Sequence, residues 1–150
     1  MEIMKKILVM SLMAFSLFAN EIIVKESCVS VDETAKNIKQ IVTAKGLSVF
    51  ATINHGANAK MVDMKLNESK MVIFGNAKLG TALMQQNMTL GLDLPLRVLV
   101  YNDIDGKVKM AYRDGSWLQN KHVLNAPKKI AKVNKAMENI TTKAGQCLKD

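Results

Sequence analysis

The residues best suited to chemistry lie in one short segment, Asn54–Ala59, which reads NHGANA. His55 is the strongest single candidate, because an imidazole can transfer protons or bind a metal near neutral pH. The glycine and alanines after it let a ligand approach the backbone, and Asn58 supplies a polar side chain nearby. The alternative is a histidine that only hydrogen-bonds a loop carbonyl or lies at a dimer contact.

A second candidate segment is Gly75–Thr81, GNAKLGT, where glycines and a lysine precede an expected helix. Backbone amides at the start of a helix can hold a small anion, so Asn76 and Lys78 are candidate ligand-binding residues. The segment lacks Gly-Lys-Ser/Thr and therefore lacks the lysine and metal-binding hydroxyl of a P-loop. Turn geometry alone is the simpler explanation for these glycines.

A soft-metal site is a weaker alternative. Met61 and Met64, together with His55, have the thioether and imidazole groups that suit copper(I). Methionines at helical spacing more often fill a hydrophobic core. We therefore expect no cofactor, with a metal or haem carrier as an alternative function.

Familiar catalytic motifs are absent from the sequence. It contains neither a Gly-x-Ser-x-Gly elbow nor a His-Glu-x-x-His zinc motif. His122 lies in a lysine-rich polar stretch and is expected to be exposed. The pattern favours a non-catalytic domain that binds a small ligand or a protein partner. The alternative is a small periplasmic enzyme that uses His55 with Asn58 or Asn76.

Two cysteines, Cys28 and Cys147, lie near the two ends of the chain. In an oxidising compartment an isolated pair is most simply a disulfide. Closing so long a loop is worth about 4–5 kcal/mol in the chain-entropy model. A redox pair and a metal site are alternatives, but neither Cys-x-x-Cys nor Cys-x-x-Cys-His occurs.

The beginning of the chain has the pattern of a secretory signal peptide. Lys5 and Lys6 precede an uncharged apolar run, Ile7–Phe18, and the small residue Ala19 follows. The run is short for a membrane anchor, which needs about 20 residues. We expect residues 1–19 to be removed and residues 20–150 to form a single periplasmic or secreted domain without stable membrane insertion.

The net charge of the 150 residues is +8 at pH 7. In an exported protein such a charge indicates anionic lipid headgroups, acidic partners or simple solubility rather than nucleic acid. The composition, 49% hydrophobic with few aromatics, is typical of a packed globule.

Hydrophobic periodicity and turn residues define the elements that must position these candidates. Expected strands are 22–29, 47–53, 71–74, 96–101 and 107–112, and expected helices are 30–45, 57–64, 78–87 and 127–143. Hairpin-connected strands flanked by helices predict an α+β fold. We expect a mainly antiparallel sheet with helices on one face, a β-α-β(4)-α core and short helical insertions. Phe50, Leu99 and Tyr101 make the other face partly apolar, which favours a homodimer through the sheet or its edge.

Three sequence blocks resemble the domain-of-unknown-function 302 family. They are Asn54–Ala59, Phe74–Thr81 and Gly91–Arg97 (GLDLPLR), with Tyr112 downstream, and the likeness covers roughly residues 30–117. The resemblance implies a TATA-binding-protein-like topology, usually dimeric, without implying nucleic-acid binding. Ala77 and Gly115 stand where members often have proline.

Overall fold

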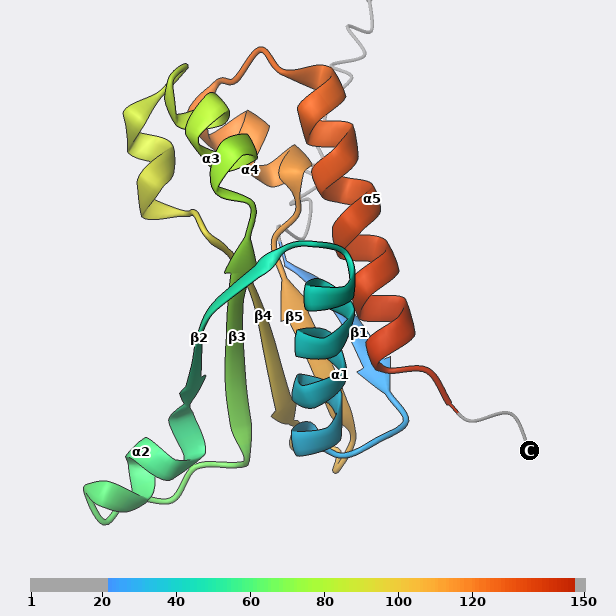
Figure 1. The fold of residues 1–150 in the computed structure, drawn as a ribbon. Helices are drawn as coiled ribbons and strands as arrows, with labels where there is room; N and C mark the ends of the chain where they lie inside the picture. Colours follow the sequence, from blue (N-terminus) through green and yellow to red (C-terminus); the bar gives the residue numbers. More distant parts are fainter. Residues whose placement is uncertain (1–21, 148–150) are drawn as a thin grey trace, which may run out of the picture.

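The computed structural model describes residues 22–147, and the expected signal peptide, residues 1–19, lies outside them (Figure 1). The strands are β1 (Ile23–Ser27), β2 (Ser48–Asn54), β3 (Ser69–Gly75), β4 (Leu96–Asn102) and β5 (Val108–Tyr112). The helices are α1 (Val31–Ala44), α2 (His55–Met61), α3 (Ala77–Met84), α4 (Gly115–His122) and α5 (Pro127–Ala144), with a 3-10 helix, η1 (Met88–Leu92).

The strands form one antiparallel sheet in the order β1-β5-β4-β3-β2. Helices α1 and α5 lie side by side across one face of this sheet, whereas α2 and α3 lie at its opposite ends (Figure 1). The expected α+β fold, its antiparallel sheet and its β-α-β(4)-α core are confirmed. Within the described residues, no helix combines the length and apolar character that a membrane crossing requires.

Helix α1 forms where its capping signals place it. The Ser30 hydroxyl accepts a hydrogen bond from the Glu33 amide at 3.1 Å, which satisfies a donor that the first helical turn leaves free. After the helix, Gly46 takes a φ of 71°, a conformation that glycine adopts without a steric penalty. Side chains three or four residues apart turn inward, and Ile38 and Val42 are fully buried.

Helix α5 supplies the second half of the main core. Its apolar residues at spacings of three and four are buried: Ile130, Val133, Met137, Ile140 and Ala144. These residues, except Ile130, pack with α1 over the inward face of the sheet. Each large side chain buried in this way contributes roughly 1.5–3 kcal/mol. Since both helices use the same face of the sheet, neither of them covers the other face within residues 22–147.

Two elements were not expected from the sequence, α4 and η1. Asp114 starts α4 by accepting a hydrogen bond from the Trp117 amide at 3.0 Å. Asn87 caps η1 in the same way, through the Thr89 amide at 3.0 Å. Together with α3 these elements form a second, smaller core, made of Leu83, Leu90, Leu118, Leu124, Ala126 and Ile130.

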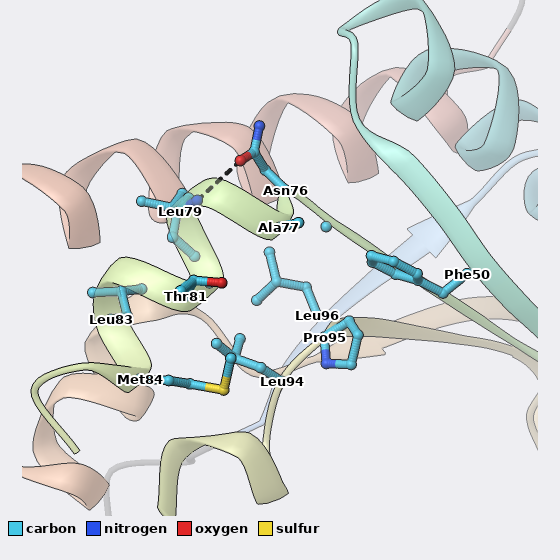
Figure 2. Close-up of a pocket in the computed structure, with 13 residues that line it drawn as sticks. Phe50, Asn76, Ala77, Leu79, Thr81, Leu83, Met84, Leu94, Pro95 and Leu96 are labelled. Atoms are coloured by element: carbon cyan, nitrogen blue, oxygen red, sulfur yellow. Dashed lines mark hydrogen bonds between the residues drawn. The ribbon is translucent and has the colours of Figure 1, made fainter. Parts of the chain in front are cut away.

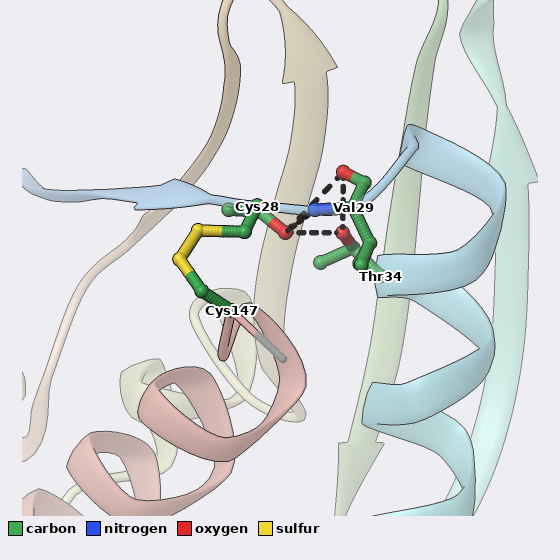
Figure 3. The surroundings of a disulfide bond; sticks show 5 residues. Cys28, Val29, Thr34 and Cys147 are labelled. Carbon is green, nitrogen blue, oxygen red and sulfur yellow. Dashed lines mark hydrogen bonds between the residues drawn. A yellow bond between two sulfur atoms is a disulfide. The ribbon is translucent and has the colours of Figure 1, made fainter. Parts of the chain in front are cut away.

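The two cysteines join the first strand to the end of the last helix. Their Cα atoms are 4.9 Å apart, and Figure 3 shows them as a disulfide. The backbone reinforces this junction, because the Cys28 amide donates to the Gly145 carbonyl at 3.0 Å. A Cβ at Gly145 would lie 3.1 Å from both the Glu26 carbonyl oxygen and Ser27 Cα, so the close approach of α5 to β1 favours glycine there.

Candidate functional site

The residues predicted to form a site lie at two opposite ends of the sheet. His55 begins α2, directly after Asn54, which pairs with Lys70 of β3. Asn76 follows Gly75, which pairs with Ser48 at the other end of β2. The length of β2 therefore separates His55 from Asn76 by about 20 Å, at ~3.3 Å per residue. The two segments do not combine into one site.

The α2 end offers little to support proton transfer by His55. Its side chain is half-buried, and Asn58, one turn later, is exposed. No hydrogen bond to the His55 ring occurs among the described residues. A polar depression of about 300 Å³ lies nearby, but Asp32, Lys60, Glu68 and Lys70 line it rather than His55. Within it, a hydrogen bond from the Lys70 ammonium lowers the pKa of the Asp32 carboxyl.

The methionines near His55 are on the surface. Met61 is 82% exposed and Met64 is 66% exposed, so neither fills the core as methionines at this spacing usually do. In the described part of the chain, no group of three or more His, Cys, Asp or Glu side chains is placed to hold a metal.

At the α3 end, Asn76 has a structural task. Its side-chain oxygen accepts a hydrogen bond from the Leu79 amide at 2.9 Å and so caps α3. That amide is one of those proposed to hold an anion, and the cap already satisfies it. Lys78 is exposed and does not line the hollow beside this helix. The segment therefore matters for the wall it builds rather than as a phosphate loop.

The segment that begins α3 forms one wall of an apolar cleft. This cleft has a volume of about 220 Å³ and lies between α3 and the Leu94–Leu96 segment (Figure 2). Its lining residues come from five parts of the chain: Phe50, Gly75, Asn76, Ala77, Leu79, Gly80, Thr81, Leu83, Met84, Leu94, Pro95, Leu96 and Val133. Figure 2 shows Met84 reaching from the helix toward Leu94, with Leu96 and Pro95 beyond it and Phe50 at the far side of the hollow.

The lining of this cleft offers few groups for polar interactions. None of its lining residues is charged, and only Asn76 and Thr81 have polar side chains. A Cβ at Gly80 would make only an ordinary van der Waals contact, with Leu94 Cδ1 at 3.7 Å, so a longer side chain there would extend toward Leu94. An apolar cavity of about 150 Å³ is large enough to bind benzene. The cleft can therefore hold a small apolar group, with hydrogen bonding confined to its edge.

The expectation that His122 is exposed is wrong. The residue is 7% exposed and lies where α4 meets η1. Its Nε2 is 2.6 Å from Asp93 Oδ2, and its Nδ1 is 3.0 Å from Thr89 Oγ1. The spacing in the sequence could have indicated this burial, because His122 comes one helical turn after the buried Leu118 and so lies on the same face of the helix.

A comparison with family models matches residues 23–144 to the domain of unknown function DUF302. The chain belongs to the DUF302 family. A solved structure of a DUF302 protein from Bacillus stearothermophilus superposes with a TM-score of 0.73 and covers 84% of this chain and 99% of that one. At 15% sequence identity, this likeness supports the shared DUF302 fold alone.

Curated relatives of this DUF302 chain occur in Brucella. "Fluoride-specific ion channel FluC 1" of Brucella suis is 37% identical over 116 residues, which are 77% of this chain and 46% of that protein. The protein of the same name in Brucella abortus is also 37% identical, with 43% of its length covered. The chain thus spans less than half of the length of these relatives.

Proposed function

We propose that this DUF302 chain is a non-catalytic domain that binds a small, largely apolar molecule in the cleft between α3 and Leu94–Leu96. The observation that carries the proposal is the cleft of about 220 Å³ with an almost entirely apolar lining. Pockets for small molecules are concave, mostly apolar and supplied with a few polar groups that fix orientation. Here the side chains of Thr81 and Asn76, the two polar residues of the lining, would supply those groups.

The volume of the cleft limits the class of ligand. A group with one or two rings, or a short branched chain, fits about 220 Å³. A long acyl chain or a nucleotide does not fit. With no charged residue in the lining, affinity depends on buried apolar area and shape, at about 25 cal/mol per Å² buried.

We also propose that the domain is exported and acts as a homodimer. The basic start and apolar run of residues 1–19 support export. A Cys28–Cys147 disulfide supports it too, since disulfides persist in oxidising compartments. The sheet face opposite α1 and α5 supports dimerisation, because Met71, Ile73, Leu99 and Tyr101 lie on it half-buried.

A protein partner is the second candidate. The Brucella relatives contain a region similar to this chain within longer proteins named as fluoride-specific ion channels. A membrane transport protein is therefore the class of partner that the comparison favours. Co-purification of a membrane transport protein with this chain, without a bound small molecule, would support this candidate.

Native mass spectrometry of the mature protein, purified from the compartment to which it is exported, tests the proposal. We expect a dimer that carries a non-covalent mass of at most a few hundred daltons. The Gly80→Leu variant should lose that mass, since its side chain extends toward Leu94 and fills the cleft. Gly80→Ala is the matched control and should retain it. Retention by the leucine variant would place the ligand elsewhere.

A further inference from the structure

An ordered turn at the end of α2 displays an unusual run of exposed apolar side chains. We name residues 60–66 the α2 tip. Met61, Val62, Met64 and Leu66 are 82%, 64%, 66% and 56% exposed. Scattered apolar residues are normal on a protein surface, but contiguous exposed patches mark interaction sites.

The backbone holds the tip in shape. The Met64 amide donates to the Ala59 carbonyl at 2.9 Å, and the Val62 amide donates to the same carbonyl at 3.1 Å. Between them, Asp63 takes a left-handed φ of 57°, which reverses the chain after the helix. Beyond the tip, Asn67 Nδ2 donates to the Asn102 carbonyl at 3.1 Å and ties the segment to the sheet. The apolar side chains are therefore presented by a fixed scaffold.

The tip projects from one extremity of the molecule, below the lower end of the sheet in Figure 1. The β4–β5 hairpin ends on the same side, since the Asn102 amide donates to the Glu68 carbonyl at 2.9 Å. Ile104 in that hairpin is 96% exposed. The apolar side chains of the tip and Ile104 therefore lie at the same end of the molecule.

The charges at this end are mixed, and acidic groups near the apolar side chains are paired with lysines. Asp103 and Asp105, on either side of Ile104, pair with Lys109, and Asp32 of α1 pairs with Lys70. Lys60 and Lys65 are exposed on either side of Asp63. Glu68 is turned back to the strand end, where Asn102 Nδ2 approaches its carboxylate at 3.5 Å. Without Lys5, Lys6 and Glu2 of the expected signal peptide, residues 20–150 carry a net charge of +7, which adds long-range attraction to anionic headgroups.

We propose that the α2 tip binds the surface of a bilayer that contains anionic phospholipid. Met61, Val62, Met64 and Leu66 enter the boundary between headgroups and acyl chains, and Lys60 and Lys65 remain among the headgroups. Apolar insertion supplies most of the affinity because the tip itself carries almost no net charge. This surface is independent of the ligand cleft, which lies at the other end of the sheet.

Co-sedimentation with vesicles of phosphatidylcholine and phosphatidylglycerol tests the proposal. We expect the Met61→Gln/Met64→Gln variant to bind about tenfold more weakly than wild type, because two inserted side chains become polar. The matched control is Met88→Gln/Leu92→Gln. It alters residues of η1 that are 77% and 78% exposed but lie at the other end of the molecule, so binding should be unchanged. Gly80→Leu should also bind vesicles normally, which separates this proposal from the ligand site.

Fluorescence gives a second readout of insertion. A Met61→Trp substitution adds an emitter at the tip to the single native Trp117, whose signal is measured in the wild type. Brominated lipid should quench the added emission, whereas that of Met88→Trp should be unaffected. Wild-type protein that does not sediment with anionic vesicles would overturn the proposal. So would equal losses of binding in the tip and control pairs.

Discussion

His122 illustrates how a single residue can join two elements. It is buried between α4 and η1, with Asp93 at one ring nitrogen and Thr89 at the other. Its backbone carbonyl accepts a further hydrogen bond from Asn87 Nδ2 at 2.9 Å. Because Asn87 also caps η1, these contacts fix the turn that leads into Leu94 and the wall of the cleft. We interpret His122 as a positioning residue for that wall.

Replacing His122 by alanine should lower the free energy of unfolding by about 1–3 kcal/mol, since partly buried polar groups lose their partner. Urea denaturation measures this as a lower midpoint at an unchanged slope. His55→Ala is the matched control. That histidine is half-buried without a ring hydrogen bond among the described residues, so a change within about 0.5 kcal/mol is expected. Equal effects of the two substitutions would contradict the assigned role.

At this scale the sequence predicted a helix start better than a buried polar residue. A helix was expected from residue 30, where the Ser30 cap depends on local spacing alone. His122 was missed because its partners, Asp93 and Thr89, come from a distant part of the chain. The neighbouring Lys121 also suggested that this stretch is exposed to solvent. The burial of His122, however, depends only on the helix face that it shares with Leu118.

Among the elements, the β4–β5 hairpin depends most on charge. Lys109 Nζ lies 2.5 Å from Asp103 Oδ2 and 2.8 Å from Asp105 Oδ2. Hydrogen bonds from Lys109 lower the pKa of both carboxyls below their ordinary value of 3.8. The same two bonds raise the pKa of the Lys109 ammonium. The hairpin is therefore more stable when both carboxyls are ionised.

This arrangement predicts a pH-dependent contribution to stability. A carboxyl whose pKa is lowered by folding stabilises the protein above its unfolded pKa, and the gain disappears as the pH falls through the folded value. We expect Lys109→Gln to be less stable than wild type at pH 7, with the difference shrinking below about pH 4. Lys128→Gln, at an exposed position of α5, should show no such trend. A difference that stays constant down to pH 2 would refute the prediction.

Elements with strong periodicity or caps were predicted closely, whereas short ones were not. Helices α1 and α5 and all the strands were expected within a few residues of their actual bounds. Helix α4 was missed because Asp114-Gly115 resembles a turn, although Asp114 is also a good cap. Helix α2 begins at His55, two residues before the predicted start, because Asn54 caps it.

At the scale of the molecule, strand pairing in the sheet sets distances between residues that sequence patterns do not give. Alternation and glycine positions were enough to predict the α+β fold. The separation of His55 from Asn76 follows from the β2–β3 register, which a local pattern does not contain. That register separates the two proposed sites: the apolar cleft lies at the α3 end and the exposed α2 tip at the other.

The central claim, a small-molecule site beside α3, is tested most directly by an NMR titration of the full chain with toluene. A ligand in the cleft should shift the amide signals of Leu79, Gly80, Leu83 and Leu94 together, in a saturable way. The Gly80→Ala variant should respond like wild type, and Gly80→Leu should show no response. Absence of a saturable shift in the wild type, or an undiminished one in Gly80→Leu, would contradict the account.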